Sequence, residues 1–194
     1  MKKFELTSEF ITNIFGTKLF RIKALIEFGN VKAGELGGFV EKEENLSQDG
    51  NAWVYDNARV YGDACVCGDA RVYGNARVHG NARVCGDARV YDNAWVYGNA
   101  WVYDNACVYG DARVCGDACV YGDAGYATVH GFGSEYRTTT FFKTKAGVGV
   151  KCGCFYGNLS EFRKKVVETH GETKKAKEYL MIADLMEFRF SDNS

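Results

Sequence analysis

A six-residue phrase that repeats twelve times over residues 51–122 constrains the fold more than any other feature of this sequence. Valine recurs every six residues from Val54 to Val120, and alanine recurs every six from Ala52 to Ala124. Asn or Asp precedes each alanine, and Gly or Asp almost always precedes that residue. A fixed short period specifies stacked units, and a period of six is typical of a parallel β-helix.

The chemistry of one phrase explains how it folds. In an extended Arg-Val-Tyr segment, side chains alternate, so valine points inward and its two neighbours point outward. The following Gly/Asp and Asn/Asp pair forms a bend because these residues tolerate positive φ. Three phrases close a triangular coil of eighteen residues, so we expect four stacked coils over residues 51–122. The fold is therefore predicted to be mainly β.

The flanking segments lack the repeat. Residues 1–30 are predicted to form an N-terminal cap of one or two strands, with an earlier helix left open. The repeat segment is predicted over residues 31–131 and includes an imperfect first coil, with Val40 and Leu46 at alanine positions. Residues 132–194 are predicted to form a small β-β-α-α domain that plugs the end of the stack or docks beside it. Its expected elements are strands at 138–144 and 148–156 and helices at 159–169 and 173–188.

Composition excludes several classes of protein. The formal net charge of −1 gives no basis for general nucleic-acid or membrane affinity. No apolar run is long enough to span a membrane, and acidic Glu5 and Glu9 argue against a signal peptide. Six of the eight cysteines occupy outward positions that elsewhere hold Tyr, Arg or Trp. We interpret them as substitutions within the repeat and not as a disulfide framework, which favours a reducing, cytoplasmic compartment.

Outward positions eighteen residues apart share one face of a β-helix. Aromatic and arginine residues are enriched at interface hot spots, so these columns are candidate binding surfaces. The predicted binding residues are Trp53, Tyr55, Arg71, Tyr73, Arg89, Tyr91 and Tyr109 on the first face, Trp95 on the second and Trp101 on the third. The alternative is that these ladders only stabilise their own sheet through cross-strand and cation–π contacts.

No metal, cofactor or catalytic residue is expected. Cys65, Cys67 and Cys85 cluster on the third face, but they have neither metal-ligand spacing nor a neighbouring histidine. Cys152 and Cys154 are predicted to lie on one strand and to have a structural role. His79 is the only histidine within the twelve repeats, and no partner base is evident.

The valine-and-alanine phrase resembles the bacterial hexapeptide-repeat proteins, which implies a left-handed parallel β-helix. Many members of that family are trimeric acyltransferases, and others are carbonic anhydrases with three metal-binding histidines. The lead-in VKAGELGGFVEKEENLSQDGNAWV and the tail TTTFFKTKAGVGVKCGCFYGNLSEF are similar to those of uncharacterised hexapeptide proteins of Firmicutes and their phages. The repeat has neither the long loop of the acyltransferases nor the clustered histidines of the carbonic anhydrases.

Three functions therefore compete. The first is a non-enzymatic binding protein that docks a protein partner or its own copies as a dimer or trimer. The resemblance extends it to a phage or prophage accessory protein that blocks a host defence system. The second is an acyltransferase-like enzyme with a site between subunits. The third is a protein that sequesters a nucleotide-like ligand with Arg71 and Arg89 near Tyr73 or Tyr91.

Overall fold

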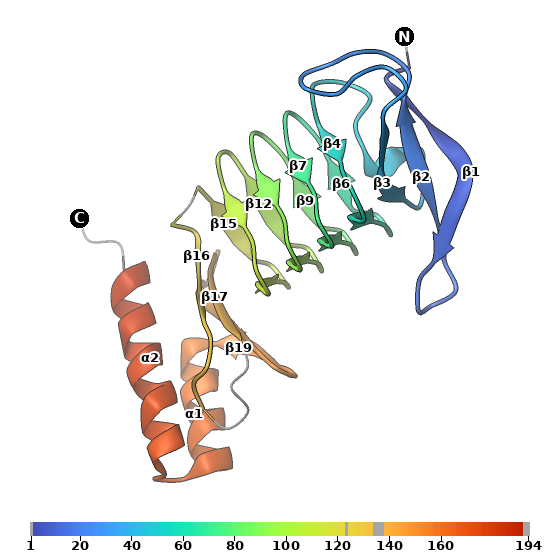
Figure 1. Ribbon diagram of the computed structural model, residues 1–194. Helices are drawn as coiled ribbons and strands as arrows, with labels where there is room; N and C mark the ends of the chain where they lie inside the picture. Colours follow the sequence, from blue (N-terminus) through green and yellow to red (C-terminus); the bar gives the residue numbers. More distant parts are fainter. Residues whose placement is uncertain (1, 123, 134–137, 192–194) are drawn as a thin grey trace.

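The computed structural model describes residues 2–122, 124–133 and 138–191, and it consists of an N-terminal hairpin, a three-sided solenoid and a C-terminal α+β part (Figure 1). Met1 of the predicted cap and residues 134–137 and 192–194 of the predicted C-terminal domain lie outside the described residues. No helix in the described ranges is long and apolar enough to cross a membrane. The division of the chain into three domains stays a prediction.

Each phrase forms one short strand, and the strands stack into three parallel faces. The first face comprises β4 (Trp53–Val54), β7 (Arg71–Val72), β10 (Arg89–Val90) and β13 (Cys107–Val108). The second contains β5 (Arg59–Val60), β8 (Arg77–Val78), β11 (Trp95–Val96) and β14 (Arg113–Val114). The third contains β6 (Cys65–Val66), β9 (Arg83–Val84), β12 (Trp101–Tyr103) and β15 (Cys119–Tyr121).

The inward valine and alanine columns form the solenoid core. Every valine from Val54 to Val120 and every alanine from Ala52 to Ala118 is buried. Strands of neighbouring coils pair in register at a separation of eighteen residues, for example Val72 with Val90. The predicted mainly-β parallel β-helix, with its four coils and inward valines, is therefore confirmed.

The bends also form columns, and their sequence follows from the backbone. Asp56, Asp92 and Asp104 replace the usual glycine and share its positive φ, at 51°, 59° and 53°. Two of these carboxylates accept a hydrogen bond from the glycine one coil later: Asp56 from Gly74 N and Asp92 from Gly110 N. Aspartate therefore pairs with an amide of the next coil at these two positions.

The N-terminal cap is built of strands, and no helix is found in its described residues. Strands β1 (Phe4–Thr12), β2 (Lys18–Ala24) and β3 (Leu36–Val40) are antiparallel neighbours. Strand β3 pairs in parallel with β5, so the cap extends the second face of the solenoid to a seven-stranded sheet. The hairpin of β1 and β2 lies at the N-terminal end of the stack in Figure 1.

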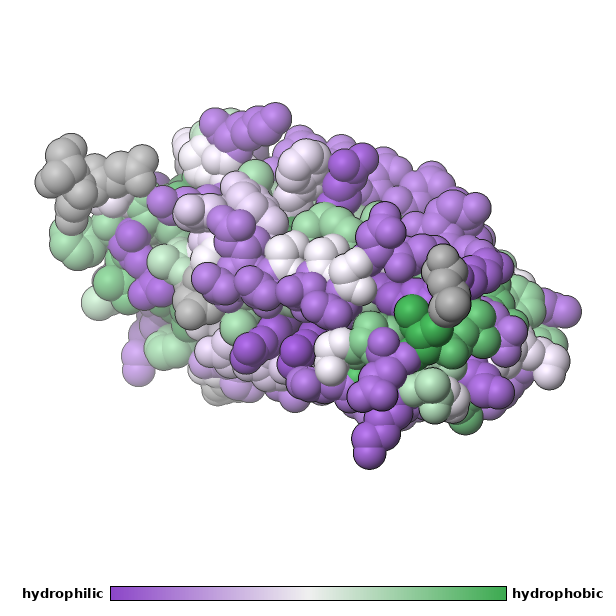
Figure 2. Space-filling model, turned by 90° about the horizontal axis from the view of Figure 1, so that it is seen from above, coloured by the Kyte–Doolittle hydropathy of each residue, from purple (hydrophilic) through white to green (hydrophobic). Residues whose placement is uncertain are grey.

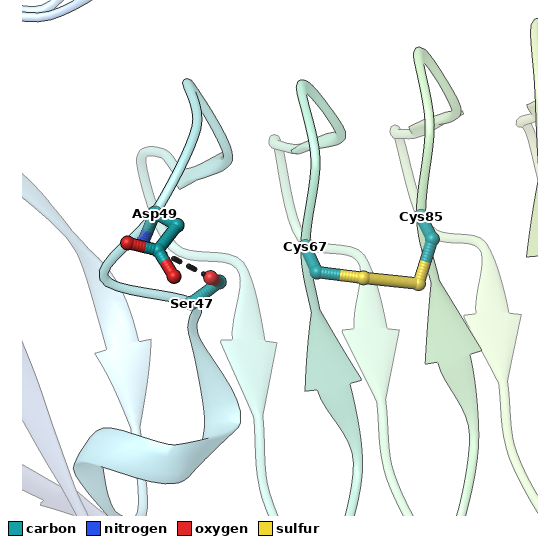
Figure 3. The surroundings of a disulfide bond; sticks show 4 residues. All are labelled: Ser47, Asp49, Cys67 and Cys85. Carbon is teal, nitrogen blue, oxygen red and sulfur yellow. Dashed lines mark hydrogen bonds between the residues drawn. A yellow bond between two sulfur atoms is a disulfide. The ribbon is translucent and has the colours of Figure 1, made fainter.

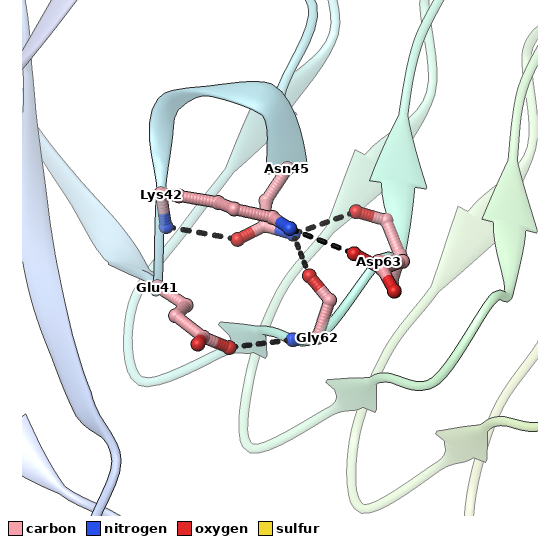
Figure 4. Close-up of polar contacts among 6 residues, drawn as sticks. Glu41, Lys42, Asn45, Gly62 and Asp63 are labelled. Atoms are coloured by element: carbon pink, nitrogen blue, oxygen red, sulfur yellow. Dashed lines mark hydrogen bonds and ion pairs between the residues drawn. The ribbon is translucent and has the colours of Figure 1, made fainter.

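The predicted positions of Val40 and Leu46 are wrong. Val40 pairs with Val60 and Leu46 with Val66, so both occupy valine positions and not alanine positions. Each pair is separated by twenty residues instead of eighteen, because two extra residues lie between Leu46 and Val54. The segment includes a 3-10 helix at Glu43–Asn45, whose buried Asn45 amide donates to Gly62 O and Ala64 O (Figure 4).

The C-terminal part covers the other end of the solenoid. An antiparallel sheet of β16 (Tyr126–Val129), β17 (Thr139–Thr144), β18 (Gly147–Cys152) and β19 (Phe155–Asn158) precedes α1 (Leu159–His170) and α2 (Lys174–Phe190). Phe142 of β17 joins the solenoid core, and the two helices pack against the other side of the sheet around Phe141. Helix α1 begins at the predicted capping box of Asn158 and Glu161, and Gly171 follows its last residue.

Two strands in this part differ from the sequence-based expectation. No pattern in the sequence indicated β16, which pairs with β17 although it lies within the predicted repeat segment. The segment 148–156 bends at Gly153, where φ is 56°, and continues as β19. Cys152 and Cys154 therefore do not share one strand, and the prediction that they do is wrong.

Lys3 caps the first coil. Its side chain donates the hydrogen bonds that the amides of a preceding coil donate elsewhere in the stack. Inside the stack, Ala70 O accepts from Trp53 N and Gly68 O accepts from Ala52 N. The equivalent carbonyls of the first coil, Ala52 O and Gly50 O, accept instead from Lys3 Nζ at 3.0 and 3.3 Å. The Lys3 side chain is buried, and burial lowers its pKa from 10.5 to about 8.

We predict that Lys3→Met destabilises the protein by about 1–3 kcal/mol at pH 7, because buried carbonyl groups lose their donor. The unfolded chain holds this proton up to about pH 10.5, whereas the folded chain releases it near pH 8. The stability difference between wild type and variant should therefore widen as pH rises from about 8 to 10. Urea unfolding followed by circular dichroism measures it.

The matched control is Lys2→Met, because Lys2 makes an exposed ion pair with Glu43. Such pairs contribute about 0–1 kcal/mol, so this variant should unfold close to wild type at every pH. Equal unfolding midpoints for Lys3→Met and wild type would show that Lys3 is not the closing group.

Candidate functional site

The first face carries a stacked row of tyrosines. Tyr73 and Tyr91 stack at 5.0 Å between ring centroids, and Tyr91 and Tyr109 stack at 5.3 Å. Tyr55 meets Tyr73 edge-on at 6.4 Å, and Tyr126 closes the row against Tyr109 at 6.3 Å. Tyr91 therefore has both ring faces covered by other tyrosines of the row. Burial raises the pKa of the Tyr73 hydroxyl.

Trp53 does not belong to the exposed part of this face, and the prediction that it does is wrong. Its side chain is 0% exposed, because Phe4 and Phe28 of the N-terminal cap pack edge-on against the indole. The outward position is covered here by an element that the repeat pattern does not include. Arg71 and Arg89, by contrast, flank the tyrosine row with half-buried and exposed side chains.

The second face has two mixed ladders. His79 lies stacked between Tyr61 and Tyr97, at 4.8 and 5.1 Å between ring centroids. Burial, with a smaller contribution from Arg77, lowers the pKa of His79, and its buried Nε2 has no hydrogen-bond partner among the described residues. His79 is therefore a neutral stacking group.

Trp95 forms the second ladder of this face. It lies between the guanidinium groups of Arg77 and Arg113, at 4.6 and 5.3 Å from the ring centroid.

The third face contains a disulfide that the repeat pattern did not predict. Cys67 and Cys85 occupy the same outward position in neighbouring coils, and their Cα atoms lie 4.7 Å apart (Figure 3). The interpretation of all six repeat cysteines as unlinked substitutions is therefore wrong for this pair. Cys65 is not bonded, and burial raises the pKa of its thiol. The predicted cytoplasmic compartment, which relied on unlinked cysteines, stays a prediction.

Trp101 also lies on the third face, where a groove separates the solenoid from the C-terminal sheet. The groove has a volume of about 940 Å³. Its solenoid wall includes Arg83, Trp101 and Cys119, and its opposite wall includes the β17–β18 turn at Lys145. Trp101 is 49% exposed, whereas the other two tryptophans are buried or half-buried.

The structure thus separates the predicted binding residues. Tyr55, Tyr73, Tyr91 and Tyr109 share one row with Arg71 and Arg89, whereas Trp95 and Trp101 lie on different faces. The repeat pattern did not indicate the groove. The column order showed Cys119 after Trp101, but nothing in the repeat placed the Lys145 turn opposite them. Among the described residues, no group of three histidine, cysteine or acidic residues is placed to hold a metal ion.

Comparison with known proteins supports the repeat architecture. A family model described as a YdcK β-solenoid repeat matches residues 52–68, 64–80, 70–86 and 82–98. The chain is also similar to the protein named "Uncharacterized acetyltransferase YdcK" of Escherichia coli strain K12, with 40% identity over 63 residues. That match covers 29% of this chain and 19% of the relative, so the chain spans about a fifth of the relative's length. The predicted similarity to proteins of Firmicutes and their phages stays a prediction.

We predict that replacing Cys67 and Cys85 together by serine lowers stability by about 3 kcal/mol, because the bond closes a loop of eighteen residues. Urea unfolding without reductant should show the loss, and dithiothreitol should bring wild type toward the variant. Cys65→Ser is the control, because Cys65 lies in the same strand region and is not bonded. Unchanged stability of the double variant, with no response of wild type to reductant, contradicts the prediction.

Proposed function

We propose that this protein is a non-enzymatic binding protein whose solenoid presents the tyrosine row of the first face to a protein partner or to another copy of itself. The observation that supports this proposal is the row of Tyr55, Tyr73, Tyr91 and Tyr109, stacked and flanked by Arg71 and Arg89. Stacking fixes the rings before binding, so little side-chain entropy is lost when a partner docks. Tyrosine and arginine are also the residues that most often form interface hot spots.

Folding alone does not require tyrosine in this row. On the third face, Cys67 and Cys85 occupy the equivalent outward positions, and their strands pair in the same way. Hydrophilic residues cover most of the surface in Figure 2, with apolar residues in separate patches. A row of tyrosines with neighbouring arginines has the composition that interface cores favour. The resemblance to phage proteins makes a host protein the first partner to test.

The second candidate is an acetyltransferase, which the name of the E. coli relative favours. The geometry of the one histidine in the repeat does not support it. His79 lies between two aromatic rings, and its Nε2 is buried. A general base must reach the proton that it removes, and the buried Nε2 of His79 does not reach a substrate.

We predict that a variant with Tyr73→Ser, Tyr91→Ser, Arg71→Ala and Arg89→Ala folds normally but loses its assembly or partner binding. Each hot-spot loss costs about 2 kcal/mol of binding free energy, while the inward valine and alanine columns remain. Light scattering after size exclusion measures self-assembly, and affinity capture measures the partner. Circular dichroism tests folding. The control is Arg59→Ala with Tyr121→Ser, which changes the same residue types on other faces.

If the fourfold variant keeps both the oligomeric state and the captured partner of wild type, the row serves only to stabilise the sheet. If it loses both while the control keeps them, the interface lies on the first face.

We also predict that the purified protein releases no free thiol from acetyl-CoA above background with amine, hydroxyl or sugar acceptors. His79→Ala should keep the partner binding of wild type, because the ring acts only in stacking. Turnover that is present in wild type and absent in His79→Ala would instead establish an enzyme.

A further inference from the structure

Trp101 has an indole face that the solenoid leaves uncovered. In the ladder of the second face, Trp95 has an arginine on each side, Arg77 before it and Arg113 after it. In the third face, Arg83 covers Trp101 from the preceding coil at 5.4 Å, but the paired residue of the following coil is Cys119. Because cysteine is too small to cover an indole, the second face of Trp101 opens into the groove.

The groove provides the room that a stacked ring requires. The turn between β17 and β18 forms the opposite wall with Lys145 and Ala146, and the volume of about 940 Å³ is within the range of small-ligand sites. A ring in this space would lie over Trp101 in the same relation that the Arg113 guanidinium has to Trp95. Aromatic side chains bind nucleobases in this way, by stacking.

Two basic side chains of the groove, Arg83 and Lys145, provide attraction for an anionic group. The lining also contains the carboxylates of Asp117 and Glu161, whose hydrogen-bond donors are the neutral Asn99 Nδ2 at 3.0 Å and Asn158 N at 2.9 Å. Arg83 is the charged group that lies over the Trp101 ring, at 5.4 Å from its centroid, so an anionic group beside a stacked base meets a guanidinium there.

We propose that this groove is a binding site for a nucleotide, with the base stacked on the open face of Trp101 and the phosphates near Arg83 and Lys145. The site lies within one chain, between its solenoid and its C-terminal sheet, and is separate from the tyrosine row of the first face. Base stacking, guanidinium contact and a lysine charge together explain why Trp101 is exposed in a groove that Arg83 and Lys145 line.

The test is titration of the full-length protein with ATP by isothermal calorimetry, with adenosine and inorganic tripolyphosphate as partial probes. ATP should bind more tightly than either fragment, and added salt should weaken its binding because the phosphate contacts are screened. Trp101→Ala should weaken ATP binding about tenfold or more. Lys145→Ala should weaken ATP and tripolyphosphate but leave adenosine unchanged.

The decisive variant is Cys119→Arg, which restores the arginine–tryptophan–arginine order of the second face and covers the open indole face. It should abolish ATP binding without loss of stability, because arginine already fills this position in four other repeats of the second and third faces. Cys107→Arg is the matched control, since Cys107 has the same position in the same coil but on the first face. It should bind ATP as wild type does.

Two results overturn the proposal. One is that none of ATP, GTP, CTP and UTP binds to wild type at concentrations up to about 1 mM. The other is that Cys119→Arg, folded by circular dichroism, binds ATP as tightly as Cys107→Arg. Neither result bears on the first-face interface, which the tyrosine and arginine replacements test independently.

Discussion

The backbone of each coil is satisfied only by the coils beside it, and this dependence determines how both ends of the solenoid are built. At the N-terminal end, Lys3 Nζ donates to carbonyl groups that an earlier coil would otherwise serve, while Asn45 Nδ2 does the same for Gly62 O and Ala64 O. At the C-terminal end, the amide of Arg113 has no carbonyl of a following coil to donate to, and it donates to the Thr140 hydroxyl instead. The caps therefore act through individual side-chain groups as well as by covering the core.

The same eighteen-residue ladder controls the outer surface. An outward side chain has its counterparts one coil before and one coil after as its closest lateral neighbours, so its exposure depends on what those two residues are. Tyr91 is stacked on both sides and Trp95 is covered on both sides, whereas Trp101 is covered on one side only. The Cys67–Cys85 disulfide joins two such lateral neighbours covalently.

Residues within the repeat were predictable from the sequence because one local rule fixes them all. The inward valines, the eighteen-residue pairing and the capping box at Asn158 follow from period, side-chain size and local hydrogen bonding. Trp53 was misplaced because its exposure depends on Phe4 and Phe28, which come from a non-repetitive segment. The repeat period likewise does not specify the two-residue offset before Val54 or the position of the Lys145 turn, because both depend on tertiary packing.

A β-helix of this kind offers few places where a ligand can bind. Valine and alanine fill the interior of every coil, and the repeat contains no inserted loop that would form a pocket of its own. Binding is then restricted to flat outer faces, which suit a protein partner, and to the junction where the stack meets another element, which provides depth. The Trp101 groove is such a junction, since its walls come from the solenoid and from the β17–β18 hairpin. Because the hairpin that closes the last coil also forms one wall of the groove, the capping requirement itself creates a site for a small molecule.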